Sequence, residues 1–445
     1  MLKLFMRTLA LKNSHRHSIK ICLFLYYDIN YSMISYNSLG MLLREIMNLT
    51  IYADITIVGA GPIGLLAAIL FSSKNLKISV IDCNTEISIA EPKDDGRAVA
   101  LNTETVSCLK SIGLWDQIDE KDKFPIMSAA VFDGDSNSYL SFDRESFKPV
   151  GFFVKNSIIR KALYNKIIQN SHINIYYEKR VKAIVENSYK KITIDCNDIN
   201  FKQSLLIAAD GRFSHLRNFA QISYKQKDFN RFMYLVEIKH KNSHHNKAIE
   251  QFMYGGLTCA ILPLSDYCSS IALSVYKSKA NLMNEDFLFK TINDCVERHI
   301  GEVEEIHSSH CYPLISTYAQ SFFNQSLALI GDAAIGMHPV TAHGFNLGVY
   351  GIKTLAYEIH KIDLDSLLQK KLALLKYQFK LHLNAKPLYD MTNVIVQTFS
   401  SDSNHLLRKG ILLAADKLPL WKDIVYARMG VKKMPFFHLL NQNNL

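Results

Sequence analysis

The stretch that decides the fold is residues 54–64, Asp-Ile-Thr-Ile-Val-Gly-Ala-Gly-Pro-Ile-Gly. Its first five residues are a short, β-branched apolar run, typical of a buried parallel strand. A Gly-x-Gly-x-x-Gly turn follows, then a helical pattern over residues 65–73 and a second strand pattern over residues 78–81 that ends at Asp82. This order predicts a βαβ unit that binds a dinucleotide. Asp82 follows the last glycine by 18 residues, close to the spacing of about 20 that the motif requires.

Each glycine of the turn has a separate structural task. Gly59 permits the tight turn, Gly61 lets a pyrophosphate approach the backbone, and Gly64 lets the helix pack closely on the strand. The helix N-terminus offers unpaired N–H groups and a partial positive charge to the phosphates. Asp82 can accept a hydrogen bond from a ribose hydroxyl, and an acidic residue here favours FAD or NAD over NADP.

Two later segments distinguish FAD from NAD. Residues 205–214 form an apolar strand pattern ending in Asp-Gly, and residues 327–334 form another ending in Gly-Asp. Together with the glycine turn, they resemble the group A flavoprotein monooxygenases, which have the fold of p-hydroxybenzoate hydroxylase. A fourth segment, residues 95–101 (Asp-Gly-Arg-Ala-Val-Ala-Leu), resembles the ubiquinone-biosynthesis hydroxylases within that group. The resemblance extends from residue 47 to about residue 430.

The resemblance implies a set of FAD-binding residues. The pyrophosphate is expected at the turn formed by Gly59, Ala60, Gly61, Pro62, Ile63 and Gly64, and the ribose at Asp82. Arg97 is expected near the pyrophosphate and ribityl chain, and Asp332, after Gly331, at the ribityl hydroxyls. Asp210 is expected to support the FAD and the region where the reductant acts. Apart from the resemblance, Arg97 would be interpreted as a surface residue and Asp210 as a turn residue.

The segment after Pro339 has a physical logic of its own. From Gly344 onward, apolar residues recur at helical spacing on one face. The N-terminus of such a helix can point at the flavin pyrimidine, where negative charge gathers, and stabilise it by roughly 0.3–2 kcal/mol. The family pattern at this point is Gly-Gln-Gly-x-Asn, whereas this chain has Ala342-His343-Gly344 and keeps Asn346. The run from residue 337 to 346 is most similar to the demethoxyubiquinol hydroxylase branch.

Few side chains are expected to be catalytic, because the cofactor supplies the chemistry. The resemblance implies ring hydroxylation by O2 through a C4a-hydroperoxyflavin, with NAD(P)H or an electron-transfer protein as the reductant. His338 and His343 are candidates for proton transfer near the flavin, and Pro339 for shaping the wall beside it. The alternative for each histidine is a hydrogen-bonded structural role. The eight cysteines show no C-x-x-C and no zinc-ligand spacing with histidine, so no metal site is predicted.

Composition and charge limit the class of chain and the kinds of partner that the protein can have. Of 445 residues, 48% are hydrophobic and 21% charged, which excludes a disordered or fibrous chain, and the net charge is +10. This surplus fits an anionic partner or a lysine-rich solvated surface. The apolar and basic region from Leu406 onward is expected either to lie on a membrane or to pack on the core. No basic-aromatic motif predicts nucleic-acid binding.

We expect an α/β (α+β overall) architecture: a discontinuous Rossmann-like FAD-binding domain, an inserted antiparallel substrate sheet and a C-terminal helical region. The boundaries are 1–46 for a leader, 47–180, 181–225 and 321–385 for the FAD-binding parts, 226–320 for the substrate domain, and 386–445 for the helical region. The leader is disordered, untranslated or a targeting segment. A cytoplasmic, peripherally membrane-associated protein is expected, on the mitochondrial matrix side if the leader is a transit peptide.

Three functions remain open at this point. The first is an FAD-dependent hydroxylase acting on a polyprenylated phenol or quinol of ubiquinone biosynthesis, such as a 5-demethoxyubiquinol 5-hydroxylase, alone or within a biosynthetic complex. The second is a soluble flavin hydroxylase or reductase for another aromatic or lipid substrate. The third is a non-catalytic flavin-binding scaffold, which the altered segment at Ala342-His343-Gly344 favours.

Overall fold

The computed structural model describes residues 49–134, 139–143, 149–197 and 199–399. The chain divides into two units, Met1–Leu49 and Thr50–Leu445, and the description below concerns the second. The predicted leader and the apolar, basic region from Leu406 onward lie outside the described residues.

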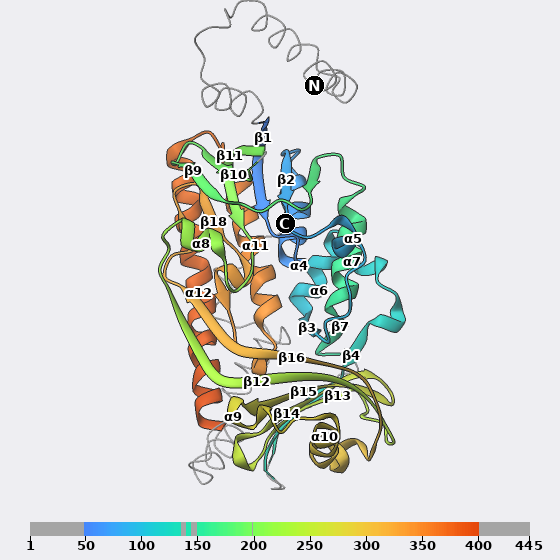
Figure 1. Cartoon of the computed structure of the whole chain (residues 1–445). Helices are drawn as coiled ribbons and strands as arrows, with labels where there is room; N and C mark the ends of the chain where they lie inside the picture. The colour runs from blue at the N-terminus through green and yellow to red at the C-terminus, as the bar shows by residue number, and fades with distance from the viewer. Residues whose placement is uncertain (1–48, 135–138, 144–148, 198, 400–445) are drawn as a thin grey trace, which may run out of the picture. The chain divides into compact units, whose positions relative to one another are not determined.

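The first sheet carries the predicted βαβ unit (Figure 1). β1 (Leu49–Val58) pairs in parallel with β2 (Ile78–Ile81), and β2 with β8 (Ile173–Tyr176). The helix α4 (Pro62–Ser72) joins β1 to β2 and buries its leucines in the core. On the other side of β1 lie β11 (Ile199–Ala208), β18 (Leu327–Leu329) and β17 (Phe323–Asn324). The turn after β1 and the turns after β11 and β18 therefore lie along one edge of this sheet, because β11 and β18 are also parallel.

Two further strands from residues 181–225, which were expected in the FAD-binding domain, extend the first sheet. β10 (Ile192–Asp195) pairs antiparallel with β11 on one side and with β9 (Ala183–Asn187) on the other. The antiparallel pairing with β11 holds both strands in the nucleotide-binding sheet.

The second sheet has eight strands and forms the lower layer in Figure 1. Its order is β19-β16-β12-β15-β14-β13-β5-β6. The strands are β5 (Ser128–Asp133), β6 (Tyr139–Asp143), β12 (Tyr224–His240), β13 (Lys247–Phe252), β14 (Thr258–Ser265), β15 (Cys268–Tyr276), β16 (Val303–Ala319) and β19 (Ile335–Gly336). β5 and β6 come from the segment expected in the first FAD-binding part, and β5 joins this sheet by a parallel pairing with β13.

One face of the second sheet is covered by α10 (Glu285–Ile300). Leu288, Ile292 and Val296 of this helix form a buried cluster with alternate strand residues such as Ile249 and Ile261. The opposite face packs on a small third sheet made of β3 (Ala98–Asn102), β7 (Gly151–Lys155) and β4 (Phe124–Ile126). This third sheet therefore connects the second sheet to the nucleotide-binding part.

Several shorter helices lie between the strands described above. They are α5 (Glu86–Ala90), α6 (Thr103–Ser111), α7 (Asn156–Ile167), α8 (His215–Phe219) and α9 (Lys277–Ala280). Two longer helices follow β19: α11 (Gly344–Ile359) begins where the sequence predicts, and α12 (Leu367–Phe399) lies beside it (Figure 1). The Tyr377 hydroxyl of α12 donates to the Leu329 carbonyl oxygen at 2.6 Å and so fixes α12 to the first sheet.

Candidate functional site

The glycine turn after β1 is shaped by close packing at two of its three glycines. Gly59 has φ +110°, and a Cβ atom there would lie 2.3 Å from the Ala209 carbonyl oxygen. A Cβ atom on Gly64 would lie 1.9 Å from the Gly59 carbonyl oxygen. Neither position can hold a larger residue without moving backbone, which supports the close helix–strand approach predicted from the sequence.

Gly61 is different, because its space is open. A Cβ atom placed on Gly61 would have no atom of the described chain within 4 Å. Gly61 is the N-cap of α4, which has no side-chain cap and no acidic residue in its first turn. The N–H groups of Ile63 and Gly64, preceded by Pro62 at the first helical position, are therefore available to an anion outside the helix.

Asp82 lies directly after β2, and its carboxylate faces this turn. One oxygen, Oδ2, accepts a hydrogen bond from the Ala60 N–H at 2.6 Å, and Oδ1 accepts from the backbone and side-chain N–H groups of Asn84, both at 2.8 Å. Asp82 thus braces the glycine turn itself. Oδ1 already accepts two hydrogen bonds, whereas Oδ2 keeps one further lone pair that a ribose hydroxyl could use, and the ribose contact stays a prediction.

The edge of the first sheet continues through the Asp-Gly and Gly-Asp turns. Asp210 accepts from the Leu216 N–H at 3.1 Å through Oδ2, whereas its Oδ1 is buried and has no hydrogen-bond partner among the described residues. Gly211, with φ +82°, has open space where a Cβ would be. An unsatisfied buried acceptor beside an open glycine is what a bound hydroxylated or N–H-bearing group would complete.

Two arginines that were not among the sequence candidates hold these turns together. Arg212 forms an ion pair with Asp332 at 3.0 Å and also donates to the Met337 carbonyl oxygen at 3.2 Å. Arg217 is fully buried and donates to the Ala333 carbonyl oxygen at 2.9 Å. Arg212 lies in the Asp-Gly segment and Arg217 just beyond it, but only their packing shows that they reach the turn at residues 331–333, 116–120 residues away.

The N-terminus of α11 is fixed to the third sheet by Asn346. Its side-chain oxygen accepts from the Asn102 N–H at 3.1 Å, and its amide nitrogen donates to the Ala100 carbonyl oxygen at 2.7 Å. Gly344 opens the helix, and a Cβ there would meet no atom of the described chain within 4 Å. The departure Ala342-His343-Gly344 is accommodated with Ala342 in the left-handed region at φ +49°.

His338 is buried and held neutral. Its Nδ1 accepts from the Val340 N–H at 3.2 Å, and its ring lies edge-on to Phe229 at a centroid distance of 4.6 Å. Burial, together with the nearby Arg231, Arg212 and Lys227, lowers the pKa of His338 to about 3. Because Nδ1 is an acceptor, Nε2 carries the proton, and Nε2 has no partner among the described residues.

The other two catalytic candidates flank this region. Pro339 is exposed and begins the short turn that leads to α11. His343 is the N-cap residue of α11 and is partly buried. The structure therefore brings His338, Pro339, His343 and Gly344 into one segment between β19 and α11, but their catalytic roles stay predictions.

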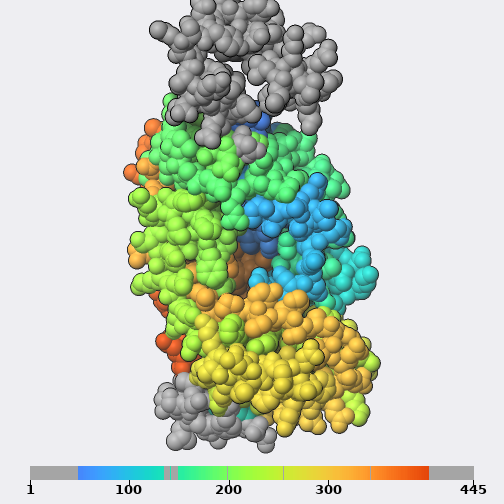
Figure 2. Space-filling view, in the orientation of Figure 1, coloured from blue at the N-terminus to red at the C-terminus, as the bar shows by residue number. Residues whose placement is uncertain are grey.

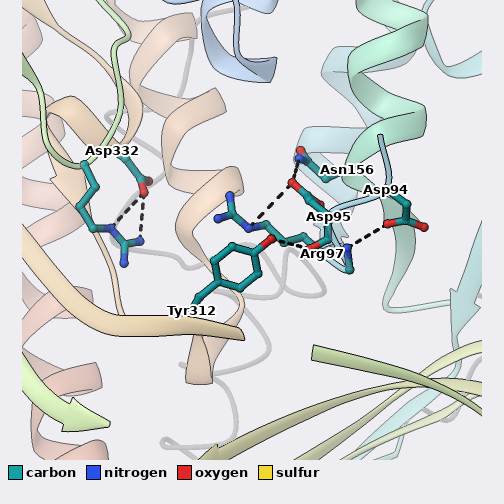
Figure 3. Close-up of polar contacts among 8 residues, drawn as sticks. Asp94, Asp95, Arg97, Asn156, Tyr312 and Asp332 are labelled. Atoms are coloured by element: carbon teal, nitrogen blue, oxygen red, sulfur yellow. Dashed lines mark hydrogen bonds and ion pairs between the residues drawn. The ribbon is translucent and has the colours of Figure 1, made fainter. Parts of the chain in front are cut away.

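Arg97 lies at the junction of the second and third sheets, where Figure 3 shows it extended toward Tyr312. The guanidinium carbon is 4.6 Å from the centre of the Tyr312 ring, and Nε lies 3.9 Å from the Asp95 carboxylate. The Tyr312 hydroxyl in turn donates to the Asp95 carbonyl oxygen at 2.9 Å. Tyr312, on β16, was not a sequence candidate, because nothing along the chain links it to Arg97.

The segment that carries Arg97 is anchored on both sides. Asn156 donates to the Asp95 carboxylate at 2.8 Å (Figure 3). Lys155 bridges Asp94 at 3.1 Å and Glu237 at 2.6 Å. Although burial lowers the pKa of Lys155, its hydrogen bonds to Glu237 and Asp94 raise it above the ordinary value overall. This ion-pair network fixes residues 94–97 between β7 and β12.

These features fit FAD. Three glycines leave the backbone open to a ligand: Gly61 at the glycine turn, Gly211 at the Asp-Gly turn and Gly344 at the start of α11. The buried Asp210 oxygen that lacks a hydrogen-bond partner among the described residues belongs to the residue next to Gly211. Figure 2 shows a hollow in the surface between the blue N-terminal residues, the green residues past 200 and the orange residues past 300. Among the residues that the structure describes, no three His, Cys, Asp or Glu side chains are placed to hold a metal ion.

Comparisons with known proteins agree with this site. The FAD binding domain family matches residues 52–362. The chain is 33% identical over 395 residues to ubiquinone hydroxylase UbiM of Neisseria meningitidis, covering 85% of this chain and 84% of that protein. It is 27% identical over 364 residues to ubiquinone hydroxylase UbiL of Rhodospirillum rubrum, covering 79% of this chain and 82% of that protein.

A solved structure shares the fold. The crystal structure of p-nitrophenol 4-monooxygenase PnpA from Pseudomonas putida superposes with a TM-score of 0.69 at 16% identity, covering 87% of this chain and all of that one. The chain belongs to the FAD binding domain family. The fold, the cofactor and the enzyme class expected from the sequence, those of an FAD-dependent monooxygenase, are confirmed.

Proposed function

We propose that this chain hydroxylates the aromatic ring of a polyprenylated phenol or quinol intermediate of ubiquinone biosynthesis. The observation that carries the proposal is the similarity to ubiquinone hydroxylase UbiM, at 33% identity along 84% of that protein's length. Experiment must identify the ring position that is hydroxylated and the electron donor, which is NAD(P)H or an electron-transfer protein.

The chain's own residues have separate tasks in this reaction. FAD, when bound, supplies the reduction of O2 and the transfer of one oxygen atom to the ring. The N–H groups of Ile63 and Gly64 would bind the pyrophosphate, with Asp82 bracing that turn at the ribose. Asp332, oriented by Arg212, would hold ribityl hydroxyls.

At the ring end of the cofactor, the chain orients and shields the reacting groups. The start of α11, fixed to β3 by Asn346, would direct its positive end at the flavin pyrimidine. His338, neutral at physiological pH, can donate a hydrogen bond from Nε2 and is a poor base there, since its pKa is about 3. Arg97, held by Tyr312, would close the pyrophosphate and ribityl side against water.

The proposal is tested by the quinone content of cells that lack the protein, measured by liquid chromatography with mass spectrometry. We expect an under-hydroxylated polyprenyl intermediate to accumulate and ubiquinone to fall, and the accumulated compound identifies the ring position. An unchanged ubiquinone pool in cells without a redundant hydroxylase contradicts the proposal. It would favour a soluble hydroxylase for another substrate, or a scaffold if the protein binds FAD but consumes no O2.

We also propose that the protein associates peripherally with an anionic membrane through α12. In the described part of the chain, no helix has both the length and the hydropathy needed to cross a bilayer. The outward face of α12 nevertheless exposes large apolar side chains at helical spacing: Leu368, Leu372, Leu375, Phe379 and Leu383. Phe379 is 65% and Leu368 67% exposed. Such a stripe can enter the headgroup region of a bilayer.

The charges beside the stripe favour anionic lipid over a second copy of the chain. The exposed charged side chains between residues 367 and 386 are all lysines: Lys371, Lys376 and Lys386, of which Lys386 is paired with the exposed Asp390. A self-paired helix would bring these lysines together, whereas an anionic surface attracts each by about 1 kcal/mol. A polyprenyl substrate would be met at the same surface.

Vesicle flotation tests this association. The protein should float with vesicles containing an anionic phospholipid and less with purely zwitterionic ones, and Phe379→Ser should weaken flotation several-fold. Ile87→Ser, at another exposed apolar residue, is the matched control and should float like the wild type. Flotation unaffected by Phe379→Ser, or a concentration-dependent dimer lost in that variant, contradicts the assignment.

A further inference from the structure

Glu250 lies on the face of the second sheet that is turned away from α10. Its neighbours in β13 point the other way: Ile249 packs in the cluster formed with α10, and Gln251 contacts His299 of that helix at 3.1 Å. Since successive side chains in a strand alternate between faces, the Glu250 side chain is directed at the opposite face.

That opposite face encloses Glu250 on two sides. Ala248 packs against the buried cluster of the third sheet, which includes Phe153, and the Phe252 ring lies 4.8 Å from the Phe399 ring at the end of α12. Glu250 therefore lies between the third sheet, which holds the start of α11 through Asn346, and the end of α12. This is the side of the second sheet where a ring substrate must lie in order to reach the flavin.

Small side chains leave space beside the carboxyl group. Across the neighbouring strands, Glu250 pairs with Ala260, and Ala260 pairs with Ala272. The next residues in this row are Leu235 of β12 and His310 of β16. Two consecutive alanines therefore stand next to the long polar side chain of Glu250 in this row.

The carboxyl group has no counter-ion. Within the described residues no hydrogen bond or ion pair engages Glu250, and burial raises its pKa to about 8. The other ionisable groups on the elements around Glu250 do not neutralise it. Lys155 is paired with Glu237, Tyr312 contacts Arg97, and His310 lies in the same row but on β16, with three strands between. Asp133 is buried on β5, and Cys259 occupies a strand position that faces α10. At neutral pH Glu250 is thus an uncharged carboxyl that can both donate and accept a hydrogen bond.

We infer that Glu250 binds an oxygen substituent of the substrate ring and orients the ring toward the flavin. This inference rests on the proposed function and names the chemistry of its ring site: a neutral hydroxy- or methoxy-substituted arene. A ring that carries a carboxylate is disfavoured, because its charge would be buried beside an uncharged carboxyl that supplies no counter-charge. An uncharged carboxyl is also isosteric with an amide, which makes the inference testable.

The test compares Glu250→Gln, Glu250→Ala and the wild type in the FAD-loaded enzyme with a short-chain quinol. Glu250→Gln should keep KM within about 3-fold, whereas Glu250→Ala should raise KM by roughly 3- to 10-fold, the loss of one uncharged hydrogen bond. The wild-type KM should rise above about pH 8, where the carboxyl ionises, and that rise should be absent in Glu250→Gln. Glu304→Gln, at an exposed carboxylate paired with Lys239, is the matched control.

A binding measurement separates this inference from the proposed function. Calorimetry measures the dissociation constant of an uncharged methoxyphenol. This constant should increase in Glu250→Ala, and in Glu250→Gln it should not change with pH. If the protein binds this probe through Glu250 but hydroxylates no quinol, the proposed function fails and the site stands. If Glu250→Ala binds and reacts like the wild type with the same pH profile, the inference is overturned.

Discussion

Gly61→Ala separates folding from cofactor binding in a single substitution. Gly61 has φ −70° and ψ 174°, a conformation that alanine adopts without strain, and the added Cβ would have no atom of the described chain within 4 Å. Alanine is a poorer N-cap than glycine, but it also lowers the entropy of the unfolded chain, and these two effects nearly cancel. The free energy of unfolding of the apoprotein should therefore change by less than about 1 kcal/mol.

The same methyl group should interfere strongly with FAD. It would occupy the space in which a phosphate meets the N–H groups of Ile63 and Gly64 at the start of α4. Loss of one charge-assisted hydrogen bond costs about 1.5–3 kcal/mol, which corresponds to roughly a 10- to 150-fold weaker dissociation constant. Quenching of flavin fluorescence measures this constant, and thermal melting of the apoprotein measures stability.

Gly64→Ala provides the contrast. Its Cβ would lie 1.9 Å from the Gly59 carbonyl oxygen, so the apoprotein itself should be destabilised by about 3 kcal/mol. Wild-type FAD affinity in Gly61→Ala would mean that the turn does not approach the pyrophosphate as proposed. A wild-type melting temperature in Gly64→Ala would mean that helix and strand do not pack as closely as described.

Three further predictions concern groups around the site. The pKa of His338 is lowered to about 3, so the unfolded chain binds more protons than the folded one below pH 6.5, and stability falls as the pH drops. His338→Gln should therefore reduce the loss of unfolding free energy between pH 7 and pH 5 by about 2 kcal/mol, measured by urea unfolding. Lys155→Met leaves two partly buried carboxylates without their cation and should destabilise the protein by about 1–2 kcal/mol, while Lys161→Met, at an exposed ion pair, should be near neutral in the same melts. Tyr312→Leu should free Arg97 and weaken FAD binding several-fold by fluorescence titration, whereas Tyr312→Phe, which keeps the ring, should bind nearly as the wild type; equal affinities would contradict the positioning role.

Local sequence signals predicted the nucleotide-binding core well. β2 spans the predicted residues 78–81, and α11 runs over residues 344–359 from the predicted glycine. These elements depend on short-range patterns: an apolar strand period, a glycine turn, and helical spacing of apolar residues. The same holds for the glycines, whose roles follow from steric limits that the motif itself encodes.

Long-range contacts could not be predicted in the same way. Tyr312 meets Arg97 across 215 residues of chain, and β5 joins the second sheet by pairing with β13; neither partner carries a local signal of the other. The uncharged state of Glu250 likewise depends on which side chains surround it in the folded sheet.

The central claim is that this enzyme places one oxygen atom from O2 on the ring of a quinol, and isotopic labelling tests it most directly. The purified, FAD-loaded protein would be incubated with a short-chain demethoxyquinol, a reductant and isotopically labelled O2, and the product analysed by mass spectrometry. We expect a hydroxylated ring that carries one labelled oxygen atom. Consumption of reductant and O2 with hydrogen peroxide as the only product, across the candidate quinols, would contradict it.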